Sequence, residues 1–403
     1  MKIWYHTLGC KVNQYETEKL RIALEKAGYH TAEDGAPFDI GIINSCAVTE
    51  TAVAKTRAAV RKARETSPGA FIIAAGCAAG FCGGLPCDLA VPPEEKDGIP
   101  ELVKQRFPVA EGPLSPALRE RTRAVVKIQD GCSQFCSYCI IPYLRNRFSS
   151  ADPAEVVEEV QALCRNGFCE IVLTGIRLGS YRAGGVSLEG LTELLLEKTD
   201  IRRIRLSSVE AWEITPGLVG LLSDSRMAKH LHIPLQSGSA RVLKAMNRPY
   251  TPEEYESLIQ NVRKQVPGIG VTTDVIAGFP GETEELFEEG LRFIEKTGFS
   301  RMHIFPFSPR RGTRAWDMPG QVDRQVKKER AARLRGLAAE MQQRFADLNT
   351  GVPQEAIFEN TDKNGFLRGY TSNYLEILTK RECPVNTPVT VTCREAKNGA
   401  LIW

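Results

Sequence analysis

The sequence predicts an α/β protein with three domains: an N-terminal Rossmann-like parallel-sheet domain over residues 1–118, a central (β/α)6 partial TIM barrel over residues 119–345, and a C-terminal small all-β barrel over residues 346–403. Two observations carry this prediction. Strand-like apolar runs alternate with amphipathic helical stretches along most of the chain, a pattern typical of parallel sheets covered by helices. After residue 345 the pattern changes to short alternating stretches separated by Asn, Asp, Gly and Pro, which is typical of a small all-β domain.

The first alternating series defines the N-terminal domain. Apolar runs predict strands over residues 2–9, 38–45 and 70–76, and amphipathic periodicity predicts helices over residues 13–28 and 51–65. Residues 81–118 are rich in Gly, Pro and acidic residues, so we interpret them as a linker.

The second series defines the central domain. Its predicted strands cover residues 123–129, 170–175, 203–208, 230–236, 269–278 and 301–307. Helical patterns lie between them, for example at residues 151–167 and 251–265, and a charged helix at residues 323–345 closes the region. Repeated βα units of this kind favour a partial barrel, with any site at the carboxyl ends of the strands.

Charge and hydropathy exclude several classes of protein. Lys plus Arg number 52 and Asp plus Glu number 49, so the net charge is only +3 and any nucleic-acid contact must be local. The start, MKIWYHTLGC, lacks the features of a signal peptide, and no apolar run reaches the ~18 residues of a membrane span. We therefore expect a cytoplasmic protein that does not enter a membrane.

In a reducing cytosol the twelve cysteines favour metal or catalytic roles over a disulfide framework. Cys132, Cys136 and Cys139 are spaced C-x3-C-x2-C directly after a predicted strand. Three thiolates on one loop can hold three corners of an iron–sulfur cube. The next residues, IIPYLRNRF, contain neither Cys nor His, which leaves one iron open, as in a catalytic site. The alternatives are a structural cluster and half of a zinc site.

A second triad, Cys10, Cys46 and Cys77, is dispersed in sequence, but each member stands at the end of a predicted strand. Because the carboxyl ends of parallel strands share one edge of the sheet, these thiols are expected to converge there. This predicts a second open cluster. The alternative is three buried cysteines that pack as small apolar side chains.

The Cys132 loop, placed after a strand and before a barrel, resembles that of the radical S-adenosylmethionine enzymes. TLGCKVNQYETE, INSCAVT, AAGC, HIPLQSGSARVLKAMNR and TTDVIAGFPGETEE resemble the methylthiotransferase family, and GFLRGYTSNYLEI resembles its TRAM module. The text CKVNQYE is similar to the branch that acts on threonylcarbamoyl-adenosine in tRNA. Other branches act on isopentenyl-adenosine in tRNA or on an aspartate of a ribosomal protein.

The resemblance implies methylthiolation of C2 of N6-threonylcarbamoyladenosine next to a tRNA anticodon. It implies two 4Fe–4S clusters, one on Cys10, Cys46 and Cys77 and one on the catalytic Cys132, Cys136 and Cys139. One S-adenosyl-L-methionine would methylate sulfur held at the first cluster, and another would give the radical that abstracts hydrogen from C2. The alternatives are the same chemistry on another substrate, or a non-enzymatic RNA-binding iron–sulfur protein.

The implied partners are tRNA carrying threonylcarbamoyladenosine, an electron donor such as flavodoxin or ferredoxin, and a sulfur donor; we expect a monomer. Candidate contacts to S-adenosylmethionine stand at or after strand ends, where turns and barrel-rim hydrogen bonds are equally good explanations: Gly175, Ser207, Glu210 and Gln236. Candidate RNA contacts are basic or aromatic, with ordinary solvated charge as the alternative for the arginines: Arg145, Arg147, Arg310, Arg311, Phe366 and Tyr370.

Two further cysteines and one histidine are expected not to bind metal, and three positions depart from the family pattern. Cys82 and Cys87 follow Cys77 closely, and we interpret them as non-ligating, with an extra iron ligand as the alternative. His232 is expected to be a hydrogen-bonded core residue and not a ligand. The family commonly has different residues at Leu144, Asn146 and Arg177, which bears on substrate details and not on the cluster cysteines.

Overall fold

The computed structural model describes residues 1–81, 84–109 and 122–403. The chain divides into two compact units. The first comprises Met1–Arg119, Asp130–Ser149 and Ser308–Trp316, and the second comprises Glu120–Gln129, Ser150–Phe307 and Asp317–Trp403. The segment that carries Cys132, Cys136 and Cys139 is therefore part of the N-terminal unit.

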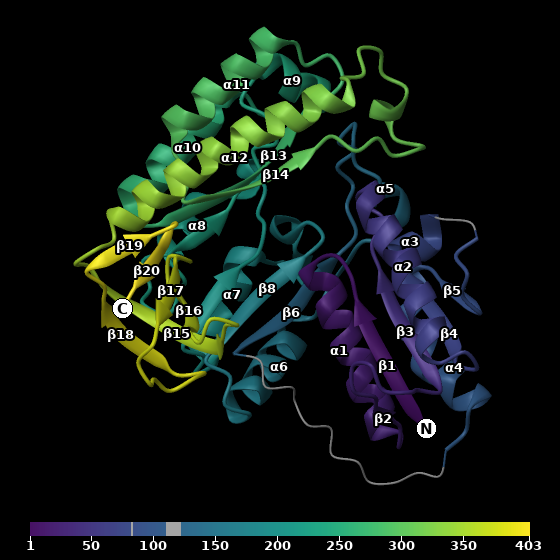
Figure 1. Ribbon diagram of the computed structural model, residues 1–403. Helices are drawn as coiled ribbons and strands as arrows, with labels where there is room; N and C mark the ends of the chain where they lie inside the picture. Colours follow the sequence, from purple (N-terminus) through teal and green to yellow (C-terminus); the bar gives the residue numbers. More distant parts are fainter. Residues whose placement is uncertain (82–83, 110–121) are drawn as a thin grey trace. The chain divides into compact units, whose positions relative to one another are not determined.

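The first unit is built on a parallel sheet with the strand order β2-β1-β3-β4-β5 (Figure 1). Its strands are β1 (Lys2–Thr7), β2 (His30–Thr31), β3 (Ile40–Ser45), β4 (Phe71–Gly76) and β5 (Leu89–Val91). Its helices are α1 (Lys11–Lys26), α2 (Glu50–Thr66), α3 (Cys77–Phe81), α4 (Ile99–Arg106) and α5 (Ile141–Leu144). The prediction of a parallel α/β sheet is confirmed.

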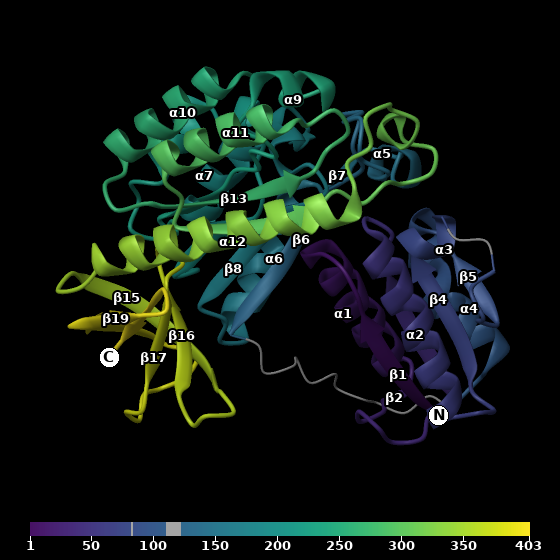
Figure 2. The same cartoon turned by 45° about the horizontal axis from the view of Figure 1, so that its top comes forward.

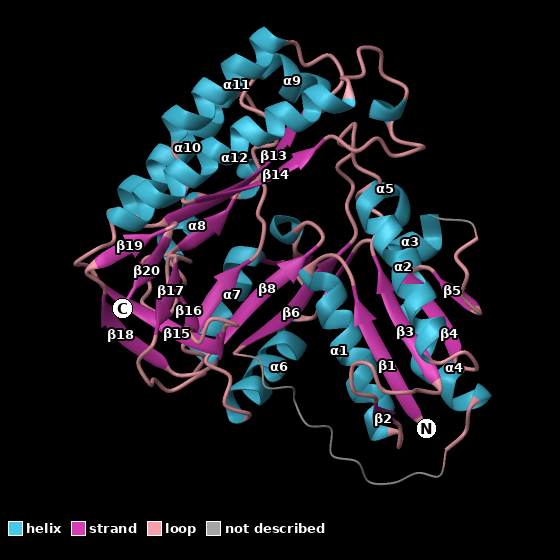
Figure 3. Ribbon diagram, viewed as in Figure 1, coloured by secondary structure: helices cyan, strands magenta, loops and turns pink. Residues whose placement is uncertain are grey.

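Alternation along the central strand produces the layers of this unit. Ile40 and Ile42 pack with α1 and α4 on one face, whereas Ile43 packs with α2 on the other. Successive strand side chains point to opposite faces, so a strand that is apolar throughout needs cover on both sides. Figure 3 shows these helices on the two faces of the magenta strands.

The linker prediction is wrong for the described part of residues 81–118. A 3-10 turn (Pro93–Gly98) and α4 follow β5, and Ile99 and Val103 are buried against the sheet. The strand has only three residues and the helix has Pro100 in its first turn, so neither gives a periodic pattern long enough to recognise.

The predicted strands of the second unit lie in two sheets, ordered β11-β8-β6-β7 and β12-β13-β14, and are parallel to their neighbours; the two-residue strand β7 was not predicted. The strands are β6 (Arg123–Asp130), β7 (Ser149–Ser150), β8 (Glu170–Gly175), β11 (Arg203–Leu206), β12 (His230–His232), β13 (Gly270–Ala277) and β14 (Arg301–Pro306). A parallel bridge between Ser208 and His232 connects the two sheets. Outward-facing Ile171, Leu173 and Val275 join one large apolar core with the surrounding helices.

Within the described part of the unit, seven helices accompany these strands: α6 (Pro153–Arg165), α7 (Leu188–Lys198), α8 (Pro216–Leu221), α9 (Ala240–Ala245), α10 (Pro252–Gln265), α11 (Glu284–Thr297) and α12 (Arg324–Asp347). Side chains at helix starts define several of these boundaries. Thr251 and Glu254 form a reciprocal capping box at the start of α10, and the Asp152 carboxylate accepts from the Ala154 amide at the start of α6. The long helix α12 packs on β14 and leads into the C-terminal strands (Figure 2).

The C-terminal region is rich in strands. A six-stranded sheet has the order β18-β15-β16-β17-β20-β19, with β15 (Pro353–Thr361), β16 (Leu367–Thr371), β17 (Glu376–Thr379), β18 (Pro388–Thr392), β19 (Glu395–Lys397) and β20 (Ala400–Ile402). Its core contains Phe358, Ile377 and Leu401, all fully buried. No helix among the described residues is long and apolar enough to cross a membrane.

Candidate active site

The dispersed cysteine triad lies at one edge of the N-terminal sheet. Cys10 is the N-cap of α1 after β1, Cys46 follows β3 directly, and Cys77 follows β4 as the first residue of α3. These three strands are parallel neighbours in register, so their carboxyl ends lie together. Burial raises the pKa of the Cys46 thiol, and charge on Cys77 or Cys10 raises it further, as expected for thiols that lie close together.

Two glycines allow the strand ends to approach this closely. Gly9 and Gly76, each directly before a cysteine, both have φ +97°. A Cβ on Gly9 would lie 2.8 Å from the Cβ of Cys46. A Cβ on Gly76 would lie 2.9 Å from the carbonyl oxygen of Ser45 and 3.0 Å from Nζ of Lys96. A larger residue at either position would be strained and would push the loops apart.

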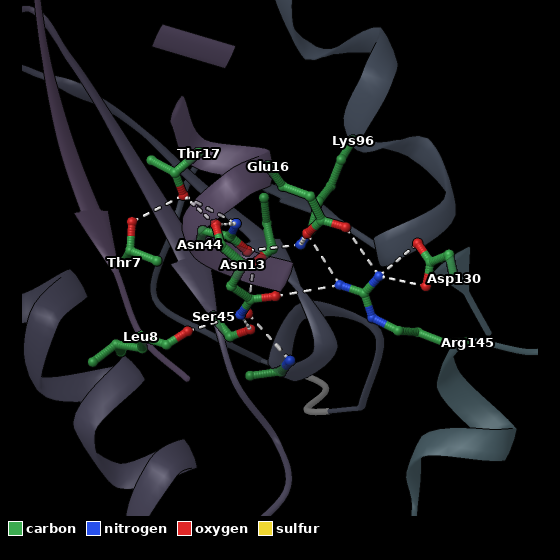
Figure 4. A network of polar contacts seen from close by, with 12 residues as sticks. Thr7, Leu8, Asn13, Glu16, Thr17, Asn44, Ser45, Lys96, Asp130 and Arg145 are labelled. Carbon is green, nitrogen blue, oxygen red and sulfur yellow. Dashed lines mark hydrogen bonds and ion pairs between the residues drawn. The ribbon is translucent and has the colours of Figure 1, made fainter. Parts of the chain in front are cut away.

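Asn13 fixes the loops that precede Cys10 and Cys46 (Figure 4). Its side-chain amide donates to the carbonyl of Leu8 at 2.7 Å and to the carbonyl of Ser45 at 3.0 Å. Asn44 in turn donates to the carbonyl of Asn13 at 2.9 Å. These buried bonds tie the first turn of α1 to the ends of β1 and β3 and hold the backbone that carries both cysteines.

A buried ionic network lies beside the triad. The Glu16 carboxylate accepts from Lys96 Nζ at 2.6 Å and from the Arg145 guanidinium at 3.0 and 3.1 Å (Figure 4). Arg145 also donates to Asp130 at 2.8 Å and to Asn13 at 3.2 Å. Burial acts to lower the pKa of Arg145, but the carboxylates outweigh it and raise that pKa, whereas burial lowers the pKa of Lys96.

The C-x3-C-x2-C loop follows directly after β6 and is held by backbone bonds. The Cys132 amide donates to the carbonyl of Arg145 at 3.2 Å, and the Cys139 amide donates to the carbonyl of Cys136 at 3.0 Å. A carbonyl in the middle of the loop, that of Ser137, accepts from the Ala315 amide at 2.7 Å. Each triad thus presents three thiols on a supported backbone, the donor set that an iron–sulfur cluster with one open iron requires.

The candidate contacts to S-adenosylmethionine lie at the carboxyl rim of the barrel strands. Gln236 has φ +68°, a conformation that non-glycine residues rarely adopt and that is concentrated at functional sites. The Glu210 carboxylate binds the Arg248 guanidinium. Gly175 is the last residue of β8, where a Cβ would meet the Gln129 side chain at 2.9 Å. Ser207 lies at the end of β11 and is largely buried.

Comparisons with known proteins place this geometry in a family. A model of the radical SAM superfamily matches residues 126–294, and a model described as uncharacterized protein family UPF0004 matches residues 2–83. The threonylcarbamoyladenosine tRNA methylthiotransferase MtaB of Bacillus subtilis is 39% identical over 93% of this chain and 90% of its own length. The MtaB protein of Thermotoga maritima is 36% identical over 92% and 89%.

The chain belongs to the tRNA methylthiotransferase family of radical SAM enzymes. Another relative, a tRNA-2-methylthio-N(6)-dimethylallyladenosine synthase of Caldicellulosiruptor saccharolyticus, is 34% identical over 91% of this chain and 84% of its own length. The radical SAM methyltransferase TsrM of Kitasatospora setae has a similar fold, with a TM-score of 0.58, 14% identity, and coverage of 76% of this chain and 74% of TsrM. Membership confirms the predicted family and brings S-adenosylmethionine and a 4Fe–4S cluster.

The candidate RNA contacts differ in how far they reach solvent. Arg147 and Arg311 are exposed. Arg145 is buried in its ion pairs, and Arg310 lies 4.6 Å over the ring of Phe81 with little exposure. In the C-terminal region, Phe366 is half-buried beneath Lys380, and the half-buried Tyr370 stacks on Tyr374 with ring centroids 5.2 Å apart.

His232 belongs to a cluster of polar side chains on β12, β13 and β14. His232 Nδ1 and His230 Nε2 each lie 2.9 Å from the hydroxyl of Thr272. His232 Nε2 lies 3.3 Å from the Asp274 carboxylate, and His303 on the next strand is part of the same cluster. His232 is hydrogen-bonded, as predicted, but its neighbours are polar side chains that recur at every second residue along the strands.

The two cysteines that follow Cys77 in the sequence are Cys82 and Cys87. Cys87 is half-buried against the α2 side of the N-terminal sheet, and Cys82 lies outside the described residues.

Proposed function

We propose that the protein methylthiolates C2 of N6-threonylcarbamoyladenosine in tRNA, with two 4Fe–4S clusters and S-adenosylmethionine as both methyl and radical source. The observation that carries the proposal is the presence of two separate cysteine triads in one compact unit, each on a fixed backbone. Several MtaB proteins named for threonylcarbamoyladenosine are 34–39% identical to this chain over most of its length, which supports that substrate.

When bound, the clusters and S-adenosylmethionine supply the radical and the methylthio group. The chain holds these groups and determines their surroundings. Cys132, Cys136 and Cys139 would hold the cluster that binds S-adenosylmethionine, and Cys10, Cys46 and Cys77 would hold the second one. The burial of Cys77 and Cys136 keeps water from part of each site, so the reactive species would be protected from side reactions.

Other residues of the proposal bind the cofactor and the RNA. Gly175, Ser207, Glu210 and Gln236 are proposed to contact S-adenosylmethionine, with Gln236 distinguished by its left-handed backbone. Of the RNA candidates, the exposed Arg147 and Arg311 are proposed to bind phosphates, and the half-buried Phe366 to stack on an unpaired base. The contacts of Arg145, Arg310 and Tyr370 are intramolecular, so we assign them structural roles first.

The test is mass spectrometry of nucleosides from tRNA that bears threonylcarbamoyladenosine, incubated without oxygen with reconstituted protein, reductant, sulfide and S-adenosylmethionine. We expect a methylthio increment on that nucleoside. Cleavage of the cofactor without an increment would overturn the substrate, and tRNA with N6-dimethylallyladenosine would then be the next substrate, because a relative named for that nucleoside is 34% identical.

Cysteine variants separate the two triads. Cys136→Ala is expected to abolish cleavage of S-adenosylmethionine, and Cys46→Ala is expected to preserve cleavage but abolish methylthiolation. Cys164→Ala, a half-buried cysteine of α6 outside both triads, is the matched control and should retain both activities. Methylthiolation by the Cys46 variant would contradict the assignment of the second cluster.

A further inference from the structure

Arg145 lies beside residues of both cysteine triads. Its backbone carbonyl accepts the amide of Cys132 at 3.2 Å. Burial raises the pKa of the Cys77 thiol, and the charges of Arg145 and Lys96 act against that rise. The residue before Arg145, Leu144, packs in the small apolar cluster that contains Cys77 and Ala78. Leu144 and Arg145 together therefore join the loop after β6 to the end of β4.

The guanidinium donates to more acceptors than a single ion pair supplies. Glu16 and Asp130 accept from it at 2.8–3.1 Å, and Asn13 accepts at 3.2 Å. Lys96 brings a second cation to the same place, 3.0 Å from where a Cβ on Gly76 would lie. The two buried cations are matched by two carboxylates, so an anionic thiolate at Cys77 adds a negative charge in the field of Lys96 and Arg145.

We propose that Arg145 is a positioning residue that sets the reduction potential of the group held by Cys10, Cys46 and Cys77 while it fixes the Cys132 loop. This inference rests on the proposed function, because it requires a cluster on the first triad. A positive charge and a hydrogen-bond donor at a ligating sulfur stabilise the more negative, reduced state of an iron–sulfur cluster. Loss of the Arg145 charge should therefore make reduction of that cluster harder.

The test measures the first cluster alone, in the full chain with Cys132→Ala, Cys136→Ala and Cys139→Ala. This parent protein is reconstituted with iron and sulfide, and its midpoint potential is determined by redox titration with electron paramagnetic resonance of the reduced cluster. Arg145→Met is expected to lower the equilibrium constant for reduction by about tenfold, a negative shift of ~59 mV for one electron. Arg145→Lys keeps the charge, so its midpoint potential should lie close to that of the parent protein.

Arg21→Met is the matched control. Arg21 is a buried arginine of the same unit that pairs with two carboxylates, Glu18 and Glu25, on α1. A general effect of removing a buried arginine would therefore appear in it as well, whereas the proposal expects its potential to equal that of the parent. If Arg145→Met does not fold, Lys96→Met tests the same charge effect, with a negative shift expected.

The outcomes distinguish this inference from the proposed function. A parent protein that binds no cluster overturns both. A cluster whose potential is equal in the parent, Arg145→Met and Lys96→Met overturns the role of these cations and leaves the two-cluster proposal standing. If Arg145→Lys shows the same shift in midpoint potential as Arg145→Met, or if Arg21→Met also shows it, the effect is structural. Either outcome also overturns the inference.

Discussion

Two carboxylates, Glu16 and Glu170, each bind two buried cations, but their surroundings differ. Glu16 binds Lys96 and Arg145, and Arg145 also binds Asp130. Glu170 of β8 binds Arg203 and Arg205 of β11 at 3.1 and 2.7 Å, inside the barrel. The first group lies beside the loop that carries Cys77, and the second contacts backbone carbonyls of the C-terminal region.

The second group has a clear structural task. The Arg203 guanidinium donates to the backbone carbonyl of Glu355 at 3.0 Å, and Arg205 donates to the carbonyls of Thr371 and Ser372 at 3.3 and 3.2 Å. These acceptors belong to the C-terminal strands, so the arginines attach that region to the barrel. Burying charge is costly, and both regions therefore retain it where the ions make additional contacts that apolar side chains do not provide.

The largest expected effect is the loss of unfolding free energy when the buried Glu170 carboxylate is removed. Glu170→Gln leaves Arg203 and Arg205 buried without a full counter-charge, and we expect a loss of about 3–5 kcal/mol of unfolding free energy. Denaturant unfolding followed by circular dichroism measures it. A loss below ~1 kcal/mol would break the comparison, because it would mean that backbone carbonyls alone satisfy the two arginines.

Acid provides the same test without a mutation. Burial acts to raise the pKa of Glu170, but Arg205 and Arg203 outweigh it, so the pKa lies below its ordinary value of 4.5. A carboxylate whose pKa is depressed by folding stabilises the protein fully above pH 4.5 and loses that contribution as the pH falls through the folded-state pKa. The melting temperature of the wild type should therefore fall more steeply below pH 4.5 than that of Glu170→Gln. Parallel profiles would contradict the role of this ion pair.

The smallest effect is expected at the outer end of the same group. Glu355 binds Arg203 at 2.6 Å through a side chain that is 41% exposed, and its backbone carbonyl accepts from the same guanidinium. Glu355→Gln should therefore cost no more than about 1 kcal/mol in denaturant unfolding. A larger cost would show that the attachment depends on charge at the surface and would weaken the contrast with Glu170.

The elements with long periodic patterns were predictable, and so were the cysteine positions. Strand ends could be located from apolar runs such as residues 38–45, and the parallel arrangement then brings Cys10, Cys46 and Cys77 together. The sheet beyond β4 was not predictable, because a three-residue strand and a short helix after Gly- and Pro-rich text resemble a linker.

The buried polar contacts beside the cysteine triad could not be predicted from the sequence either. Lys96 stands in the segment PPEEKDG, where a lysine is ordinarily solvated, yet it is 3% exposed. Arg145 has the same sequence signature as Arg147, a basic residue after the cysteine loop, but its partner Glu16 lies 129 residues away. Only the fold shows which of the two charges is used inside the protein. The segment NQYE, which contains Asn13 and Glu16, was the one feature of the sequence that pointed to these contacts.

The assignment of the Cys132 loop to the N-terminal unit has a consequence for how such chains can be recombined. Residues 130–149 are inserted between barrel segments, yet Arg145 pairs with Glu16 of the helix that begins at Lys11. A chimera of two relatives joined at residue 119 would combine Glu16 from one parent with Arg145 from the other. Exchange of the N-terminal domain is therefore expected to succeed only when the loop after β6 is exchanged with it. These two segments must come from the same parent.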